Sequence, residues 1–277
     1  SDVVMKEMYT FQDKSGEYIT LRPEGTAGIA RAIISNGLTQ NLPFKVYYYG
    51  PMFRYERPQK GRLRQFHQLG LELLGLSSPY ADLEVIALAN SLIQNLNISK
   101  DIILEINSLG SLNSRKKYKK VLKDYLKGNI KSLSKLSLQR LERNPLRVLD
   151  SKEEQDKEII INAPILIDHL TKEDLDNFKI LKELLSYQNI KFHFNPHLVR
   201  GLDYYCHTTF EFIVKQDKKN LTILAGGRYD GLTSQLGGPD IPGIGWAAGI
   251  ERLSMLSNLL DKPYLLVYFI PIDIKNI

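Results

Sequence analysis

The sequence predicts an α+β fold whose sheet is interrupted by a helical insertion. Short strand-like runs alternate with helical patterns over residues 8–106. Two hairpin patterns, at residues 47–74 and 210–225, lie on either side of a long basic stretch, residues 114–147. Apolar residues recur at helical spacing in that stretch, whereas each hairpin places strand-like runs around a polar turn. A chain that combines antiparallel hairpins with helical stretches in this way is typical of α+β proteins.

The composition is typical of a soluble globular protein. The chain has 277 residues, of which 43% are hydrophobic and 25% charged, and no apolar run approaches the roughly eighteen residues of a membrane span. A single cysteine, Cys206, excludes an internal disulfide framework and a thiolate-only zinc site, so we expect a cytoplasmic protein without a membrane partner. The net charge of +6 is too small to decide whether a partner is a polyanion.

Four segments are expected along the chain. The predicted helices cover residues 27–36, 81–96, 114–147, 172–187 and 250–260, and single strands are expected at 191–194, 210–214 and 221–225. We expect residues 1–107 to form the first part of the core, 108–190 a helical insertion, 191–262 the second part of the core, and 263–277 the start of a further domain. The chain begins without an initiator Met and its last run predicts a strand, so a fragment is expected.

The hairpin at residues 47–74 carries the most informative side chains. Alternation along a strand places Arg54 and Glu56 on one face of the first strand. The polar or aromatic face of the second strand carries Phe66, Gln68, Gly70 and Glu72, and the other face is apolar, with Leu69, Leu71 and Leu73. Unpaired buried charge is costly, so this polar face is expected to meet a ligand.

The chemistry of this face suits a nucleotide. Arg54, with Arg62 or Arg64 from the loop, could grip a polyphosphate, because a guanidinium offers paired donors that match phosphate oxygens. Phe66 could stack on a flat base. The alternative is that these arginines and glutamates pair with one another on a solvated sheet face.

A turn at residues 21–26, LRPEGT, leads into the first helix. It places Glu24 and Thr26 at the helix start, where they could hold an ammonium group. Alternatively, Glu24 only complements the positive end of the helix dipole.

Three later segments suggest pocket walls. Residues 198–205, LVRGLDYY, combine a flexible glycine with Arg200, Asp203 and the pair Tyr204 and Tyr205. Residues 225–232, AGGRYDGL, contain paired glycines that allow a ligand or a neighbouring strand to approach, unless they form a tight turn beside a solvated arginine. Residues 243–253, GIGWAAGIERL, place Arg252 in the first turn of a helix, where a cation is disfavoured without an anionic partner.

Together these segments resemble the class II aminoacyl-tRNA synthetases, and among them the histidyl-tRNA synthetases. Residues 53–72, FRYERPQKGRLRQFHQLGLE, resemble class II motif 2, and residues 243–253 resemble motif 3. The segments LVRGLDYY and AGGRYDGL resemble the two signatures of the histidine enzymes, with LRPEGT upstream. The resemblance covers nearly the whole chain and implies a class II antiparallel sheet flanked by helices.

The resemblance also implies residue roles. Arg54 would hold the α-phosphate of ATP and Arg200 would lie between that phosphate and the histidine carboxylate, so these two are the candidate catalytic residues. The other candidate ATP-binding residues are Glu56, Arg62, Phe66 and Arg252. The candidate histidine-binding residues are Glu24, Thr26 and Gln68 at the α-amino group and Glu72, Tyr204 and Tyr205 around the imidazole. Mg²⁺ is expected on the ATP phosphates, with no metal ligand among the protein residues.

The implied function is ATP-dependent formation of histidyl-adenylate and its transfer to tRNA(His), by a homodimer. The chain departs from the family pattern at its ends, because the motif 1 region and nearly all of the C-terminal anticodon-binding domain, which residues 263–277 would begin, are absent. The basic insertion could contact the tRNA acceptor arm or be a solvated helical surface. Two non-catalytic alternatives are the histidine-sensing regulatory subunit of ATP phosphoribosyltransferase and a synthetase-like module of a larger sensor.

Overall fold

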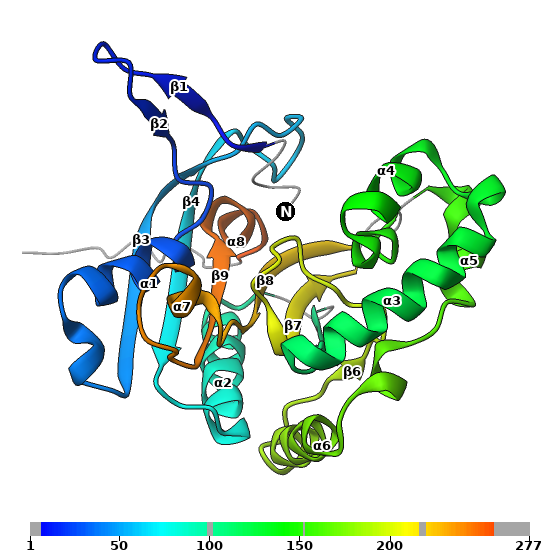
Figure 1. Ribbon diagram of the computed structural model, residues 1–277. Helices are drawn as coiled ribbons and strands as arrows, with labels where there is room; N and C mark the ends of the chain where they lie inside the picture. Colours follow the sequence, from blue (N-terminus) through cyan, green and yellow to red (C-terminus); the bar gives the residue numbers. More distant parts are fainter. Residues whose placement is uncertain (1–6, 99–101, 152, 216–219, 258–277) are drawn as a thin grey trace, which may run out of the picture.

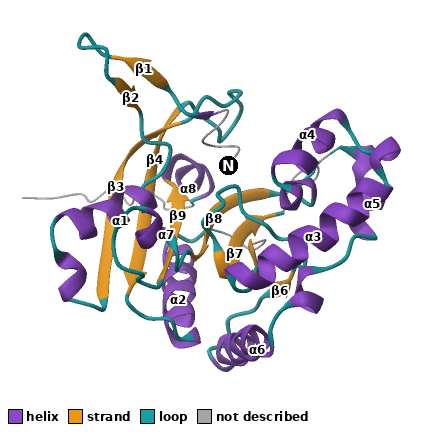
Figure 2. Cartoon of the chain, viewed as in Figure 1, coloured by secondary structure: helices purple, strands orange, loops and turns teal. Residues whose placement is uncertain are grey.

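The computed structural model describes residues 7–98, 102–151, 153–215 and 220–257, and its centre is a seven-stranded sheet. The strands are β3 (Phe44–Phe53), β4 (Gln65–Leu74), β5 (Ile102–Ser108), β6 (His193–Phe194), β7 (Cys206–Val214), β8 (Leu221–Arg228) and β9 (Gly243–Gly249). Their order is β3-β4-β9-β8-β7-β5-β6. Neighbouring strands are antiparallel except β5 and β6, which are parallel. The predicted α+β class with an antiparallel sheet is confirmed (Figure 2).

Helices surround this sheet. They are α1 (Thr26–Ser35), α2 (Pro79–Asn95), α3 (Leu112–Gly128), α4 (Lys135–Arg143), α5 (Lys157–Ile161), α6 (Lys172–Tyr187), α7 (Leu232–Gln235) and α8 (Ile250–Leu256). Short 3₁₀ turns lie at Leu38–Gln40, Ile130–Ser132, Pro145–Val148, Glu154–Asp156 and Leu166–His169. A separate hairpin of β1 (Thr10–Gln12) and β2 (Tyr18–Thr20) stands away from the sheet (Figure 1). Within the described residues, every helix is too short or too polar to cross a bilayer.

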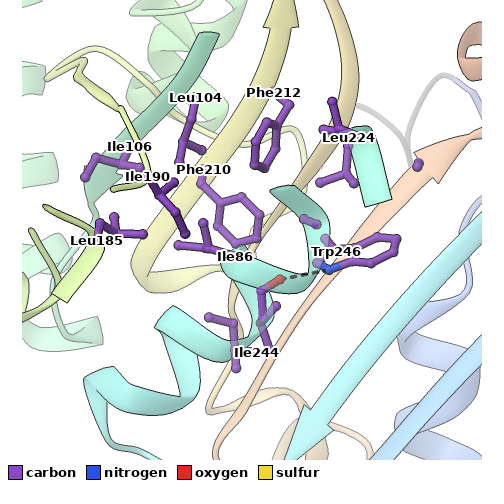
Figure 3. Packing of buried hydrophobic residues seen from close by; sticks show 14 of the residues in the cluster. Ile86, Leu104, Ile106, Leu185, Ile190, Phe210, Phe212, Leu224, Ile244 and Trp246 are labelled. Carbon is purple, nitrogen blue, oxygen red and sulfur yellow. Dashed lines mark hydrogen bonds between the residues drawn. The ribbon is translucent and has the colours of Figure 1, made fainter. Parts of the chain in front are cut away.

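The main core lies between the sheet and helices α2 and α6. Phe210 and Ile244 from the sheet pack with Ile86 of α2, and all three are fully buried (Figure 3). Trp246 fixes α2 against β9, because its indole Nε1 donates a 3.1 Å hydrogen bond to the carbonyl of Val85. The apolar face of the hairpin meets this core through Leu69, Leu71 and Leu73 as predicted, which turns the polar face the other way.

The insertion has a second core of its own. Tyr118, Leu122 and Leu126 of α3 are buried against residues of α4 and the following turns. Asp156 is fully buried and accepts hydrogen bonds from several serine groups, including the backbone and side chain of Ser134. In Figure 1 the helices α3, α4 and α5 gather together beyond β7. The domain boundaries stay predictions, and α6 contributes to the main core.

The predicted bounds of the helices and strands agree with the structure to different degrees. The helix at residues 172–187 is confirmed to the residue, since Thr171 and Asp174 form a capping box at its start. The predicted strand at 191–194 is shorter, His193–Phe194, and the predicted strand at 210–214 begins earlier, at Cys206. The last helix ends at Leu256 rather than residue 260 within the described residues. The predicted segment 263–277 lies outside them.

Candidate functional site

A cavity of about 650 Å³ opens between the sheet and the insertion. Its walls come from the loop of the β3–β4 hairpin, strands β8 and β9, helix α8, residues 199–205 and the insertion residues Leu136 and Arg140. Eleven of the twelve predicted site residues line it: Glu24, Thr26, Arg54, Glu56, Arg62, Phe66, Gln68, Arg200, Tyr204, Tyr205 and Arg252. The exception is Glu72. Residues that lie far apart in sequence are thus brought to one concave surface.

The turn before α1 positions one side of the cavity. Glu24 precedes the N-cap, and its carboxylate accepts hydrogen bonds from the backbone N–H groups of Thr26 at 2.6 Å and Ala27 at 3.0 Å. The hydroxyl of Tyr204 donates to the same carboxylate at 3.3 Å. Glu24 therefore both satisfies the free N–H groups of the helix start and presents negative charge to the cavity. The two interpretations of this residue are compatible.

Glu72 lies one layer below the cavity. It has no exposed surface, and its two oxygens accept hydrogen bonds of 2.7 Å from the hydroxyls of Thr26 and Tyr229. Burial raises the pKa of Glu72 to about 8, with the nearby charge of Glu24 adding to the shift and the two hydroxyl donors opposing it. At neutral pH this carboxyl group is mostly protonated. Alternation along the strand predicted Glu72 on the face that meets the ligand, whereas the structure buries it beneath the cavity with Tyr229 as a partner that the sequence did not indicate.

Tyr48 fills the space above Gly70 on this sheet face. The two residues are directly opposed in the β3–β4 register. A Cβ atom on Gly70 would lie only 2.1 Å from Cζ of Tyr48, so the ring occupies the place of the missing side chain. The same ring lies 2.2 Å from a Cβ placed on Gly25. Both residues must be glycine, because a side chain at either position would overlap the Tyr48 ring near Thr26.

Gln68 lines the cavity, and one of its hydrogen-bond acceptors is unpaired. Its side chain is buried, and its Oε1 atom has no hydrogen-bond partner among the described residues. Buried polar atoms are nearly always paired in folded proteins. An unpaired amide oxygen beside Glu24 and Thr26 in one cavity wall is suited to accept a hydrogen bond from a ligand cation.

The motif 2 loop supplies two cations. Arg54 and Glu56 follow the end of β3 rather than lying on it, and Nε of Arg54 donates to the carbonyl of Pro23 at 2.8 Å. Glu56 pairs with Arg62 at 3.2 Å and lies 3.9 Å from Arg54. The predicted pairing between these residues is therefore present, and it occurs inside the cavity. The Arg54 guanidinium also stands 5.2 Å from the ring centre of Phe66, so this aromatic face is positioned beside positive charge.

Of the two loop arginines, Arg62 lines the cavity and Arg64 does not. The guanidinium of Arg64 instead lies 4.4 Å from the ring centre of Tyr55 and donates to the carbonyl of Glu56. Arg62 and Arg64 can contact different surroundings because Gly61 forms the tight turn between the two strands. Its φ of +73° is a conformation that glycine adopts readily. The sequence left this choice open.

Arg252 spans the cavity from α8. Its Nε donates to the carbonyl of Gly61 at 2.6 Å and its Nη1 to the carbonyl of Thr222 at 2.7 Å. Burial lowers the pKa of Arg252, and the positive charges of Arg62 and Arg54 lower it further. Three guanidinium groups that repel one another are therefore held in one cavity, which favours the binding of an anion.

Arg200 is a fourth arginine in the lining of the same cavity. It forms a close ion pair with Glu211 of β7, and its guanidinium lies 5.4 Å from the ring centre of Tyr205. Its Nε atom is buried without a hydrogen-bond partner in the described part of the chain. Glu211 also accepts a 2.9 Å hydrogen bond from the hydroxyl of Thr222. Sequence reasoning missed Glu211, since it meets Arg200 only where the irregular segment that carries Arg200 folds against β7.

Arg228 belongs to the frame of the site and not to the cavity. The predicted alternative of a solvated arginine is wrong, because its side chain is only 3% exposed and pairs with Asp82 of α2 at 2.7 Å. A Cβ atom on Gly226 would lie 2.2 Å from the carbonyl oxygen of Gly245. Gly226 therefore admits the neighbouring strand β9, and Gly227, whose added Cβ would lie 2.6 Å from the carbonyl oxygen of Thr208, admits β7.

One cluster outside the cavity has donor atoms of metal-binding type. Those of Cys206, His207 and Asp230 lie within 4.8 Å of one another. Burial raises the pKa of the Cys206 thiol to about 12, and the Asp230 carboxylate already pairs with Arg228 at 3.1 Å. The Sγ atom of Cys206 also accepts a 3.3 Å hydrogen bond from the backbone N–H of Asp230, and Nδ1 of His207 lies 3.2 Å from Asp174, so each group of this cluster has a protein partner.

A family model described as histidyl-tRNA synthetase matches residues 1–253. The chain belongs to the histidyl-tRNA synthetase family. It is 58% identical over 256 residues to a histidine–tRNA ligase of Rhodospirillum rubrum, covering 92% of this chain and 62% of that relative. A histidine–tRNA ligase of Latilactobacillus sakei is 49% identical over 287 residues, which cover 100% of this chain and 66% of the relative. The chain thus spans less than two thirds of the length of either relative.

Solved structures agree with this family. The apo histidyl-tRNA synthetase of S. aureus superposes with a TM-score of 0.73 at 38% identity, covering 90% of this chain and 60% of that one. A Bacillus halodurans protein described as an ATP phosphoribosyltransferase regulatory subunit/histidyl-tRNA synthetase gives a TM-score of 0.68 at 24% identity, with 93% and 70% covered. The second likeness shows the fold alone, so it does not favour the regulatory alternative.

Proposed function

We propose that the protein containing this chain is a histidine–tRNA ligase, which activates histidine with ATP and transfers it to tRNA(His). The observation that supports the proposal is one cavity whose lining combines four arginines with a group of acceptor side chains suited to a cation. The arginines are Arg54, Arg62, Arg200 and Arg252, and the acceptor side chains are those of Glu24, Thr26 and Gln68. Such a cavity is suited to a polyphosphate together with a zwitterionic amino acid.

The protein would bind the two charged groups of histidine and its ring. Glu24 and the free oxygen of Gln68 would accept hydrogen bonds from the α-ammonium group. Tyr204 and Tyr205 would flank the imidazole, with Glu72 acting from below through the hydroxyls of Thr26 and Tyr229. A site built to hydrogen-bond a ring strongly rejects an apolar analogue, because its own polar groups are then left unpaired.

The ATP would lie along the arginine side. Arg252 and Arg62 would neutralise the outer phosphates, Arg54 would hold the α-phosphate, and Phe66 would stack on adenine beside Glu56. Mg²⁺ would be bound chiefly by phosphate oxygens and water, and the carboxylates of Glu56 and Glu211 in the same cavity are of the oxygen type it prefers. When bound, it would neutralise negative charge on the phosphates.

The first reaction would be in-line attack of the histidine carboxylate oxygen on the α-phosphorus. A new P–O bond forms, the bond to the bridging oxygen breaks, and pyrophosphate leaves with that electron pair. Arg54 and Arg200 both line the cavity, and they would stabilise the charge that develops on the phosphoryl oxygens. In the second reaction the 3′-terminal hydroxyl of tRNA attacks the mixed anhydride and AMP leaves. No proton acceptor is assigned for that step.

The remaining partners form part of the same proposal. The basic surface of α3 and α4 would contact the tRNA acceptor arm, since lysines and arginines gain affinity for phosphates by releasing counterions. A homodimer is proposed from family membership, and the exposed Tyr47 and Tyr49 on the edge strand β3 are compatible with a covered surface. A cytoplasmic location follows from the tRNA substrate.

The test is histidine-dependent exchange of labelled pyrophosphate into ATP by the full-length protein. We expect exchange with histidine and none without it. Arg200→Met should lower the exchange rate by roughly 10² or more, as for loss of one preorganised charge-stabilising donor. The control is Arg31→Met, which removes the same charge from the exposed side of α1. Histidine binding without any exchange would replace the ligase proposal with the regulatory one.

A further inference from the structure

The segment at residues 198–205 carries three of the candidate site residues in the cavity but has no regular secondary structure. Arg200, Tyr204 and Tyr205 all project from it. Irregular backbone holds a precise geometry only when neighbouring groups fix it, because each ordered residue costs about 1–2 kcal/mol of conformational entropy. The contacts that hold this segment therefore decide whether the cavity wall exists.

One end of the segment is held by the sheet. The side-chain amide of Asn107, which is buried at the end of β5, donates to the carbonyls of Pro196 at 3.2 Å and Leu198 at 3.0 Å. These bonds fix the backbone just before Arg200. They do not reach the two tyrosines.

The other end is held by the insertion. Arg115 of α3 donates through Nη1 to the carbonyl of Tyr205 and through Nη2 to the carbonyl of Asp203, the latter at 2.9 Å. Asn144, at the end of α4, donates a 2.7 Å hydrogen bond to Oδ1 of Asp203. Arg115 thus holds the residues on either side of Tyr204, and Asn144 holds one of them, Asp203.

The chemistry of Arg115 suits this contact. A guanidinium presents its donors in a fixed planar fork, so two carbonyls bound to it are fixed relative to one another. Burial lowers the pKa of Arg115, because the charged guanidinium is partly removed from water. Neighbouring lysines of α3, such as Lys116, are exposed instead.

We propose that Arg115 is a positioning residue, which holds residues 203–205 in the cavity wall and makes the insertion a structural part of the histidine pocket. The insertion then serves the pocket as well as any RNA it contacts. Displacement of α3 would move the backbone of Tyr205 directly. The activity part of this inference rests on the proposed ligase function, and the structural part does not.

The structural part is tested by limited trypsin digestion of the full-length protein, with cleavage after Arg200 followed by mass spectrometry. Arg115→Met removes both donors at similar side-chain length, and Lys116→Met is the matched control on the same helix. We expect Arg115→Met to speed this cleavage by roughly tenfold or more, as for loss of a charge-assisted contact. Lys116→Met should leave the rate unchanged.

The activity part is tested by pyrophosphate exchange on the same variants. Arg115→Met should raise the KM for histidine by roughly tenfold, with a much smaller change in the KM for ATP, because Arg54, Arg62 and Arg252 are held by other contacts. Should Arg115→Met prove unfolded by circular dichroism, Asn144→Ala removes only the exposed contact to Asp203 and should act in the same direction by a few-fold.

The outcomes separate the two ideas. Unchanged cleavage after Arg200 overturns the positioning role, and so does faster cleavage with an unchanged KM for histidine. A wild-type protein without histidine-dependent exchange overturns the proposed function, while the digestion still decides whether Arg115 holds the segment.

Discussion

The hydroxyl of Thr26 donates a 2.7 Å hydrogen bond to Oε1 of Glu72, which places a fully buried carboxyl group next to a residue that lines the cavity. Tyr229 binds the other oxygen at the same distance. The carboxyl group therefore acts on the cavity through hydroxyls, and its protonation state is set by burial more than by its two partners.

This arrangement predicts a pH-dependent stability that Glu72→Gln should remove. The pKa of Glu72 is raised from 4.5 to about 8, so the folded state holds an additional proton between these values. The stabilisation is fully present below pH 4.5 and is lost as the pH rises through about 8. Since each unit of pKa difference is worth about 1.4 kcal/mol, the free energy of unfolding should fall by roughly 2 kcal/mol or more between pH 5 and pH 8.

Urea denaturation at both pH values measures this effect. The Gln side chain does not titrate, so the unfolding free energy of Glu72→Gln should fall less over the same range, and other titrating groups cancel in the comparison. Parallel pH dependences in the two proteins would contradict the raised pKa.

Arg252 provides a test of the nucleotide side. Its two hydrogen bonds to the carbonyls of Gly61 and Thr222 fix a planar fork across the cavity, and a lysine cannot reproduce both. Arg252→Lys should lower kcat/KM for ATP in pyrophosphate exchange by about 10² while the protein stays folded. The control is Arg57→Lys on the exposed part of the same loop. Equal losses in both variants would mean that Arg252 has no special position.

The sequence predicts local features of this fold better than the site's supporting contacts. The hairpin at residues 47–74 follows from alternation, and the helix starting at Lys172 follows from its capping residues. Two pairings could not be predicted in this way. Glu211 meets Arg200 only where an irregular segment folds against β7, and Asp82 meets Arg228 only through helix packing, and both depend on contacts between distant parts of the chain.

The same limit applies inside the candidate site. Side-chain chemistry and the family resemblance together selected the residues of the cavity, because arginines, carboxylates and tyrosines are costly to gather without a ligand. The burial of Glu72 beneath the cavity could not be predicted from alternation. Alternation shows on which face of a strand a side chain lies, but not which other residues cover that face. The covering residues here are Thr26 of α1 and Tyr48, whose ring lies over Gly70.

The buried ion pair between Arg228 and Asp82 should carry a large penalty when broken from one side. Both side chains are under 5% exposed, so Arg228→Met leaves a buried carboxylate unpaired and should lower the free energy of unfolding by about 3–5 kcal/mol. Lys45 and Glu84 form an ion pair that is more than 50% exposed, and Lys45→Met should cost about 1 kcal/mol at most. Chemical denaturation compares the two.

A double variant checks the mechanism. Adding Asp82→Leu to Arg228→Met removes the unpaired charge, so the double variant should be more stable than Arg228→Met alone. A double variant that loses the sum of the two single losses would show that packing, and not the unpaired charge, controls stability at this position.

Substitution by alanine should change stability in opposite directions at two glycines whose surroundings differ. Gly28 lies on the exposed side of α1 with nothing within 4 Å of an added Cβ, so Gly28→Ala should raise the free energy of unfolding by roughly 0.5–1 kcal/mol through helix propensity. At Gly245 the added Cβ would lie 1.7 Å from Oε2 of Glu72 and 2.4 Å from the carbonyl oxygen of Leu71. Because strand pairing holds that carbonyl in place, Gly245→Ala should separate β9 from β4 and lower the melting temperature by several degrees or prevent folding. Differential scanning calorimetry of both variants decides the point, and a Gly245→Ala protein as stable as the wild type would show that the Glu72 carboxyl group has room to move.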